Sequence, residues 1–181
     1  VFTRQNEDDK IPVYLKRAEK IVTSLPEDYS TARNYNWLAF EYETWYTRTE
    51  RMSLVDSGYA FAEKAIAAGK QFNNPEQLTQ SFRAFEAFAY HRGQIRQAVS
   101  YMDSALFYAR KIRVPTNLAA LFIAKSSDLL DLGEKAEAVR WADTSIWYVE
   151  KDFKGTSASV NNYLQASQIF EAAGELPKAL Q

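Results

Sequence analysis

Apolar side chains recur along this chain at the spacing of an α-helix. In the first such segment Ile11, Leu15, Ala18 and Val22 lie three or four residues apart, which places them on one face of a helix. No segment alternates apolar and polar residues in the way a half-buried strand does. The pattern therefore predicts an all-α protein. The expected helices cover residues 12–25, 30–46, 53–72, 75–92, 95–112, 115–132, 135–151 and 157–173.

The helix boundaries carry local signals. Asn74, Pro75 and Glu76 combine a capping side chain, a proline suited to the first helical turn, and an acid near the positive end of the helix dipole. Pro115 opens a helix in the same way, and Gly155 with Thr156 separates the last two helices.

An internal repeat divides the second half of the chain. Gly93, Gly133 and Gly174 are spaced 40 and 41 residues apart. Alanine follows each glycine by five residues, and a small residue follows the first two by twelve; these positions are Ala98, Ala138, Ala179, Ala105 and Ser145. A weaker repeat upstream appears when Asp56 is aligned with Asp103. Such a period predicts stacked helix pairs that bury their apolar faces against one another.

The repeat has a direct physical basis. Glycine adopts the left-handed conformation that ends the first helix of a pair. The small residues five and twelve positions later lie seven apart, on one face of the second helix, so they allow close approach to its partner.

Glycine at the turn, alanine five residues later and a small residue twelve residues later resemble the tetratricopeptide repeat (TPR) family. The resemblance implies antiparallel helix pairs stacked as a right-handed TPR-like α-solenoid of about eight or nine helices. Three features depart from the family: the period exceeds the usual ~34 residues, the proline that closes the second helix is missing, and the first repeat has no turn glycine.

The second helices also resemble TPR segments of bacterial, Bacteroidetes-like, signalling and regulatory proteins. Strings such as MDSALFYARK and ADTSIWYVEK carry this likeness. In those proteins the repeats lie beside a histidine kinase or a DNA-binding regulator, which implies a sensor or docking segment here.

The domain organisation expected from these patterns is simple. Residues 1–10 form a polar tail, and 11–181 form a single TPR-like domain with repeat turns near 46–52 and at the three glycines. Because the chain begins at Val1 and a helical pattern starting at Glu175 stops at Gln181, we expect a fragment of a longer protein.

Charge and composition exclude several classes of function. The formal net charge is -1, from 22 basic and 23 acidic residues, so no basic excess favours nucleic acid. The longest apolar run, 118–124, is far shorter than the ~18 residues of a membrane span. The sequence has no cysteine and hence no disulfide or thiolate metal site. We expect a soluble protein, cytoplasmic or periplasmic.

Residues with catalytic chemistry are sparse, so we expect no enzyme, no cofactor and no metal; an enzyme is the remote alternative. His91 is the only histidine and lies at a helix end, where it suits the dipole. Asp128 and Asp131 are three residues apart and are interpreted as a solvated face. No phosphate loop, zinc motif or nucleophile elbow occurs.

An aromatic cluster in the second helix allows two interpretations, a core and a recognition surface. Its members are Tyr35, Trp37, Phe40, Tyr42, Trp45 and Tyr46, and we expect most of them in the core. Because they occupy both sides of the helix, some are expected near the surface.

The TPR resemblance implies that the first helix of each pair forms a concave binding face. Counting back from each glycine gives Arg83, Ala87, Tyr90, His91, Ile123, Ser127, Leu130, Asp131, Leu164, Gln168 and Glu171, and a looser register gives Arg33, Trp37, Glu41 and Trp45 in the first repeat. The expected partner is a protein or peptide. The alternative is a scaffold element that forms a homo-oligomer through an end repeat.

Overall fold

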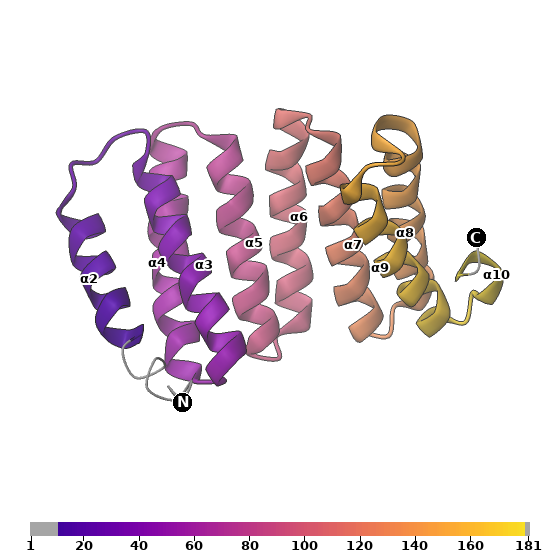
Figure 1. Ribbon diagram of the computed structural model, residues 1–181, viewed down its shortest axis with the longest axis horizontal. Coiled ribbons are helices and arrows are strands. Elements are labelled where there is room, and N and C mark those ends of the chain that lie inside the picture. Colours follow the sequence, from indigo (N-terminus) through magenta and orange to yellow (C-terminus); the bar gives the residue numbers. More distant parts are fainter. Residues whose placement is uncertain (1–10, 180–181) are drawn as a thin grey trace, which may run out of the picture. The chain divides into compact units, whose positions relative to one another are not determined.

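A computed structural model describes residues 11–179, and the polar tail expected at 1–10 lies outside these residues. The described chain consists of helices joined by short turns, without a strand between residues 11 and 179 (Figure 1). The helices are α2 (Ile11–Ser24), α3 (Thr31–Thr49), α4 (Met52–Gln71), α5 (Pro75–His91), α6 (Ile95–Ile112), α7 (Pro115–Asp131), α8 (Lys135–Tyr148), α9 (Ser157–Ala173) and α10 (Leu176–Ala179).

The eight helices expected from the sequence correspond to α2 through α9, with bounds that differ by three residues or fewer. One of them changes character before its expected end. The α-helix α8 stops at Tyr148 and continues as a π-helical segment, Val149–Phe153, in which Val149 is fully buried. A π-helical turn adds one residue to the turn, so the expectation of a regular helix to residue 151 is corrected here.

The chain divides into two compact units, 1–84 and 85–181, with the boundary inside α5. Unit 1 contains α2, α3, α4 and the first part of α5, and unit 2 contains the rest of α5 with α6 to α10. A single repeat domain over 11–181 stays a prediction.

Unit 1 is built around the pair α3 and α4. Tyr42 of α3 stacks on Phe61 of α4 with ring centroids 5.9 Å apart. The turn between the two helices is made by Glu50, which takes a left-handed φ of 55° and donates its N–H to the carbonyl of Tyr46 at 2.7 Å. Val55 and Ala62, five and twelve residues later, are fully buried. The first repeat thus shares the left-handed φ of the glycine turns without a glycine, but its bond to the carbonyl four residues back is that of the simpler αL motif.

Unit 2 repeats one turn three times. Gly93, Gly133 and Gly174 have φ of 72°, 81° and 92°. The residue after each glycine donates its N–H back to a carbonyl of the preceding helix: Gln94 to Ala89 at 2.9 Å, Glu134 to Leu129 at 2.9 Å, and Glu175 to Phe170 at 2.7 Å. These bonds define a Schellman motif, which satisfies the last carbonyls of the helix. The predicted left-handed glycines are confirmed.

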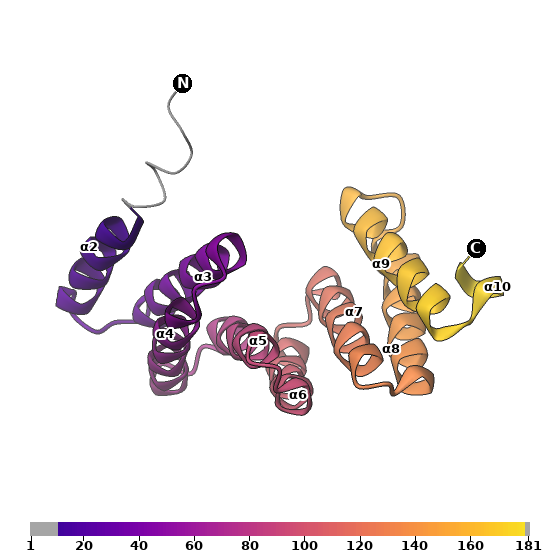
Figure 2. The same cartoon turned by 90° about the horizontal axis from the view of Figure 1, so that it is seen from below.

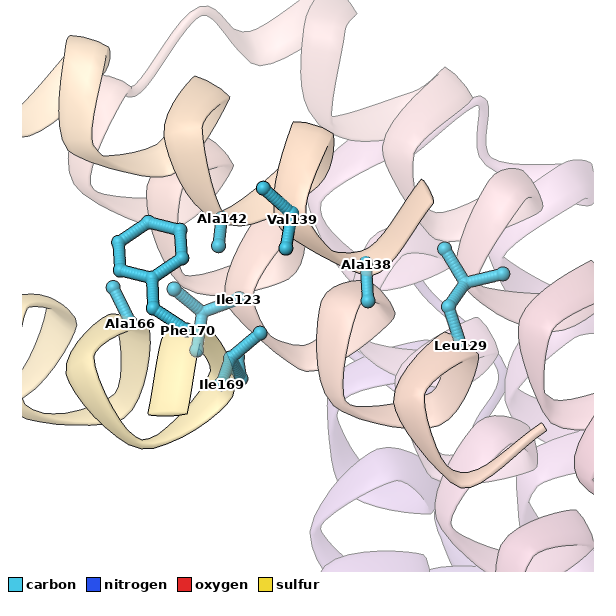
Figure 3. Packing of buried hydrophobic residues seen from close by; sticks show 8 residues of the cluster. All are labelled: Ile123, Leu129, Ala138, Val139, Ala142, Ala166, Ile169 and Phe170. Atoms are coloured by element: carbon cyan, nitrogen blue, oxygen red, sulfur yellow. The ribbon is translucent and has the colours of Figure 1, made fainter. Parts of the chain in front are cut away.

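The small residues predicted to face the partner helix do so. Ala98, Ala105, Ala138 and Ser145 have no exposed surface. In unit 2, α7, α8 and α9 lie next to one another (Figures 1 and 2). Their shared core consists of Ile123, Leu129, Ala138, Val139, Ala142, Ala166, Ile169 and Phe170 (Figure 3).

Long helices account for the 40-residue period. Helices α5, α6 and α7 have 17, 18 and 17 residues, and only two or three residues separate each from the next. Of the two possibilities, longer helices or longer loops, the structure shows longer helices.

Buried polar side chains join successive first helices within each unit. In unit 1 the Ser81 hydroxyl of α5 donates to Asn36 Oδ1 of α3 at 2.8 Å. In unit 2 the Ser145 hydroxyl of α8 lies 2.9 Å from the Ala119 carbonyl of α7 and 3.0 Å from Asn162 Oδ1 of α9. Because buried polar groups are costly unless paired, these bonds fix the register of neighbouring helices.

Candidate functional site

A groove with a volume of about 610 Å³ runs across the first helices of unit 2. It is lined by Glu86 and Tyr90 of α5, by Ile123, Ala124, Ser127, Asp128 and Leu130 of α7, and by Gln165, Gln168, Ile169 and Ala172 of α9. Its size is in the range of ligand-binding pockets. The groove therefore lies on the helices that the TPR resemblance assigns to the binding face.

The repeat explains why side chains from three helices converge. Tyr90 and Leu130 each precede their turn glycine by three residues, and Ser127 and Gln168 each precede theirs by six. Since stacked repeats place equivalent positions side by side, residues about 40 apart in sequence line one surface.

Tyr90 and Asp131 link two of the lining helices at the groove. The Tyr90 hydroxyl donates to Asp131 Oδ2 at 2.8 Å. This bond to a carboxylate raises the pKa of Tyr90, with smaller contributions from burial and from the charges of Asp131, Asp128 and Glu86. The phenol thus stays protonated and spans from α5 to α7.

Asp128 is the most unusual residue of the groove. Its side chain is 3% exposed, and burial, followed by the nearby charge of Asp131, raises the pKa of its carboxyl to about 7. Among the described residues, none forms a hydrogen bond with its Oδ2 atom. A buried carboxyl oxygen without a partner is costly, and a buried acid with a strongly shifted pKa beside a groove is a candidate functional residue.

The interpretation of Asp128 and Asp131 as a solvated face is wrong for Asp128. Asp131 is exposed, but Asp128 precedes Gly133 by five residues, as the core residues Phe88 and Ile169 precede their own glycines. The turn of helix between the two acids therefore separates a buried position from an exposed one. Alignment of the repeats by their turn glycines places Asp128 at a core position, so the sequence alone could have predicted its burial.

The candidate residues on unit 2 fall into three groups. Tyr90, Ser127 and Gln168 line the groove. Asp131 does not line it, but it accepts a hydrogen bond from the lining residue Tyr90. Ala87 and His91 are half-buried on α5 and are not among the lining residues; His91 meets Tyr90 edge-on with ring centroids 6.2 Å apart. Ile123, which is buried, and Leu130, which is half-buried, also line the groove, whereas Glu171 is exposed outside it and Leu164 lines a second hollow near α10.

The remaining candidates belong to unit 1. Arg83 is exposed on α5, and on α3 Arg33 and Trp37 are exposed while Glu41 and Trp45 are half-buried. The turn at Glu50 sets the register of α3. In that register Phe40, ten residues before the turn, is equivalent to Ile123 and Leu164.

The aromatic cluster of α3 is less buried than expected. Tyr42 is in the core, Trp37 and Phe40 are 67% and 59% exposed, and Tyr35, Trp45 and Tyr46 are half-buried. The expectation that most of the cluster is core is corrected, because the aromatic residues surround the helix and only one stripe of α3 faces α4. Arg48 lies over the Trp45 ring at 4.8 Å, which shields part of it.

Between residues 11 and 179 no helix is long and apolar enough to cross a membrane. Over the same part of the chain no group of three or more His, Asp or Glu side chains is arranged to hold a metal ion.

The chain is similar in structure to known helical repeats. No protein-family model and no curated protein sequence matches it. Nearly identical TPR-like repeats attributed to a kinesin light chain of Podosopora anserina superpose with a TM-score of 0.72 at 15% identity, over 98% of this chain and 85% of that one. A point variant of the same protein gives the same values.

A second similar structure is a STAND signal transduction ATPase with a tetratricopeptide repeat sensor from Pyrococcus horikoshii. It superposes with a TM-score of 0.73 at 14% identity, over 97% of this chain and 27% of that one. The fold defined by the helix pairs, the turns and these two structures is the TPR-like helical repeat, as the glycine spacing predicted.

Proposed function

We propose that this chain is a non-catalytic module that binds a protein or peptide, and that it forms the sensor or docking segment of a larger bacterial signalling or transcription-regulatory protein. One observation carries the first part of the proposal. The groove of unit 2 gathers the aromatic Tyr90 and the amides of Gln165 and Gln168 around an apolar floor at Ile123 and Ile169. A groove that combines apolar, aromatic and amide side chains suits an extended or helical peptide.

The sensor role rests on two weaker observations. The second helices resemble repeats of bacterial signalling proteins, and the STAND protein carries its similar repeat array as a sensor within a chain of which this one covers 27%. Fold similarity alone does not assign a role, so this part of the proposal depends on finding the partner.

The non-catalytic character is supported by what lines the groove. Among the described lining residues there is one buried acid, Asp128, and no histidine, lysine or arginine. Nucleophilic catalysis needs an activating base beside the nucleophile. The charge of Asp131 acts on Asp128, but the Asp131 carboxylate accepts the Tyr90 hydroxyl.

A peptide display experiment tests the groove directly. The purified chain is used to select from a random library of peptides of about 12 residues, and the enriched peptides are synthesised and titrated by fluorescence anisotropy. The variant Ser127→Arg with Gln168→Arg places two long side chains in the groove from exposed positions. We expect it to weaken binding by at least about tenfold.

A matched control separates groove blocking from a general charge effect. Ala136 at the start of α8 and Ser100 on α6 are exposed and do not line the groove, so Ala136→Arg with Ser100→Arg adds the same two charges elsewhere in unit 2. Its binding should equal that of the natural chain. If no enriched peptide distinguishes the two variants, the groove is not the binding site.

Self-association is a second candidate function, favoured by a hollow of about 890 Å³ between α8, α9 and α10. Ile146, Leu164 and Phe170 contribute apolar surface to it, and Leu164 is 59% exposed. A second copy covering this hollow would bury Leu164. Sedimentation velocity over a wide concentration range tests this, with Leu164→Glu as the disrupting variant. A sedimentation coefficient that does not change with concentration would rule the candidate out.

A further inference from the structure

The groove of unit 2 has an acidic end. Glu86 and Asp128 line it, and Asp131 accepts the hydroxyl of the lining residue Tyr90. None of the described residues that line the groove is basic. The chain as a whole is almost neutral, at -1, so this concentration of acids is local.

Asp128 supplies an observation independent of the acidic composition. Only 3% of the residue is exposed, and within residues 11–179 its Oδ2 atom has no hydrogen-bond donor. Folded proteins pair nearly all buried polar atoms, so an unpaired carboxylate oxygen beside a groove is an exception that points to a missing partner.

The nearest buried cation is already engaged. Lys125, one turn before Asp128 on α7, lies 2.5 Å from Asp103 Oδ1 and 4.2 Å from the centre of the Trp141 ring. Its ammonium is therefore directed to α6 and α8, while the groove is formed by α5, α7 and α9. The donor that Asp128 lacks would have to come from outside the chain.

The shape of the groove indicates what kind of donor fits. Ile123 and Ile169 provide an apolar floor next to Asp128. A long amphipathic side chain buries its methylene groups on such a floor while its charged end reaches a carboxylate. A metal ion fits less well, because it needs several carboxylates and the described residues contain no such cluster.

We propose that the groove recognises a lysine or arginine side chain of a peptide partner, whose charged end pairs with Asp128. This inference rests on the proposed function, since it names the partner chemistry of the same groove. Because the free oxygen is shielded in the present side-chain position, pairing with a cation in the groove requires rotation about the soft Cβ–Cγ bond of Asp128. Asp131 and Glu86 then reinforce the attraction for the cation.

The test starts from the peptides selected with the natural chain. Every peptide that the Ser127→Arg, Gln168→Arg variant excludes should carry a lysine or arginine at one fixed position. Replacing that residue by the uncharged, linear norleucine should weaken binding to the natural chain by at least about tenfold. The same replacement should change binding to Asp128→Asn by less than about threefold, because the paired charge is already gone.

The controls make failure of this inference distinct from failure of the proposed function. Asp152→Asn removes an exposed acid outside the groove and should bind the basic peptide as the natural chain does. Circular dichroism verifies that Asp128→Asn is folded. If groove-dependent peptides lack a fixed basic residue, or if norleucine weakens binding equally in both chains, cation recognition by Asp128 is overturned while peptide binding stands. If no groove-dependent peptide is found, both proposals fail.

Discussion

Asp128 and Lys125 are two ionisable residues that are both buried on α7, but the surroundings of their charged ends differ. On burial, the Lys125 ammonium exchanges its contacts with water for contacts with the Asp103 carboxylate and the face of the Trp141 ring. Asp128 has no such replacement at Oδ2 among the described residues. The free-energy cost of removing the Lys125 ammonium from water is therefore offset by these contacts, whereas the cost of burying Asp128 Oδ2 is not offset.

The Asp128 carboxyl should make stability depend on pH. Its pKa is raised from 3.8 to about 7, so the folded chain retains a proton that the unfolded chain releases. Its contribution to stability is present below pH 4 and is lost as the pH rises to 7. Asparagine has no proton to lose. Asp128→Asn should match the natural chain at pH 4 and exceed it by roughly 4 kcal/mol at pH 8. Urea unfolding at both pH values measures this; an equal difference at the two values would contradict it.

Lys125 should be replaceable by an apolar side chain of similar length. The Asp103 side chain is 60% exposed, so its carboxylate stays in contact with water when Lys125 is replaced, and an apolar side chain can fill the space of the buried lysine stem. We therefore expect Lys125→Met to change the free energy of unfolding by less than about 1 kcal/mol, whereas Lys125→Ala should cost roughly 2 kcal/mol through the cavity it leaves. Urea unfolding compares the two. A large loss in the methionine variant would show that the Asp103 pair itself stabilises the fold.

At the residue scale, sequence patterns predicted the small core residues but not the buried charges. Ala98 and Ala138 were found because they recur after each glycine. Asp128 was missed because it was compared with its neighbour Asp131, when the informative comparison was with Phe88 and Ile169 in the adjacent repeats. The unpaired state of its oxygen depends on side chains of other helices, which no local pattern contains.

At the scale of single elements, one turn differs from its equivalents. Glu50 ends α3 in the left-handed conformation that glycine adopts at the ends of α5, α7 and α9. A residue with a Cβ atom pays roughly 1–2 kcal/mol in that conformation. The first repeat therefore carries strain that the later repeats avoid.

Glycine at position 50 should relieve this strain. We expect Glu50→Gly to stabilise the chain by about 1 kcal/mol, less the entropy that glycine adds to the unfolded state. The matched opposite change is Gly133→Ala. An added Cβ there meets no atom within 4 Å, so its expected loss of about 1 kcal/mol comes from the backbone alone. Thermal unfolding of both variants measures the pair, and the same sign of change in both would refute this account.

Helix starts and ends were well predicted where a residue type announces them. Pro75 and Pro115 begin α5 and α7, and the turn glycines follow α5, α7 and α9 as expected. The end of α3 was uncertain because nothing about Glu50 signals a left-handed turn. The π-helical segment after Tyr148 was missed for a similar reason, since its sequence continues the helical pattern.

At the scale of the whole molecule, stability should be transmitted between neighbouring helices. In unit 2 the core cluster draws Ile123 and Leu129 from α7, Val139 from α8, and Ile169 and Phe170 from α9. No helix of this cluster buries its apolar face alone, which is the general condition of repeat proteins.

Removal of α9 and α10 should therefore weaken the helices that contact them. A chain ending at Lys154 loses Ile169 and Phe170, each worth roughly 1.5–3 kcal/mol when buried. We expect amide exchange in α8 to accelerate by at least about tenfold, while α4 in unit 1 keeps its protection. Hydrogen exchange followed by mass spectrometry resolves the two helices. Equal acceleration in both would mean that the chain unfolds as one cooperative unit.

The fold class followed from the glycine period, but the groove did not. The spacing of Gly93 and Gly133 predicted helix pairs, and counting back from them placed Tyr90, Ser127 and Gln168 on the first helices. Which of those positions converge depends on how the helices pack. Leu164 shows this, because it shares the spacing of Ile123 and yet lines a different hollow.

The long helices of this repeat would also set a length scale for the proposed peptide partner. A 40-residue period has about six residues more than the common repeat, or about three for each helix, which lengthens every helix by roughly 4–5 Å. A ligand that lies along the first helices would meet almost one additional turn of contact. A peptide matched to shorter repeats would leave that turn uncovered, so partner length itself becomes a means of selection.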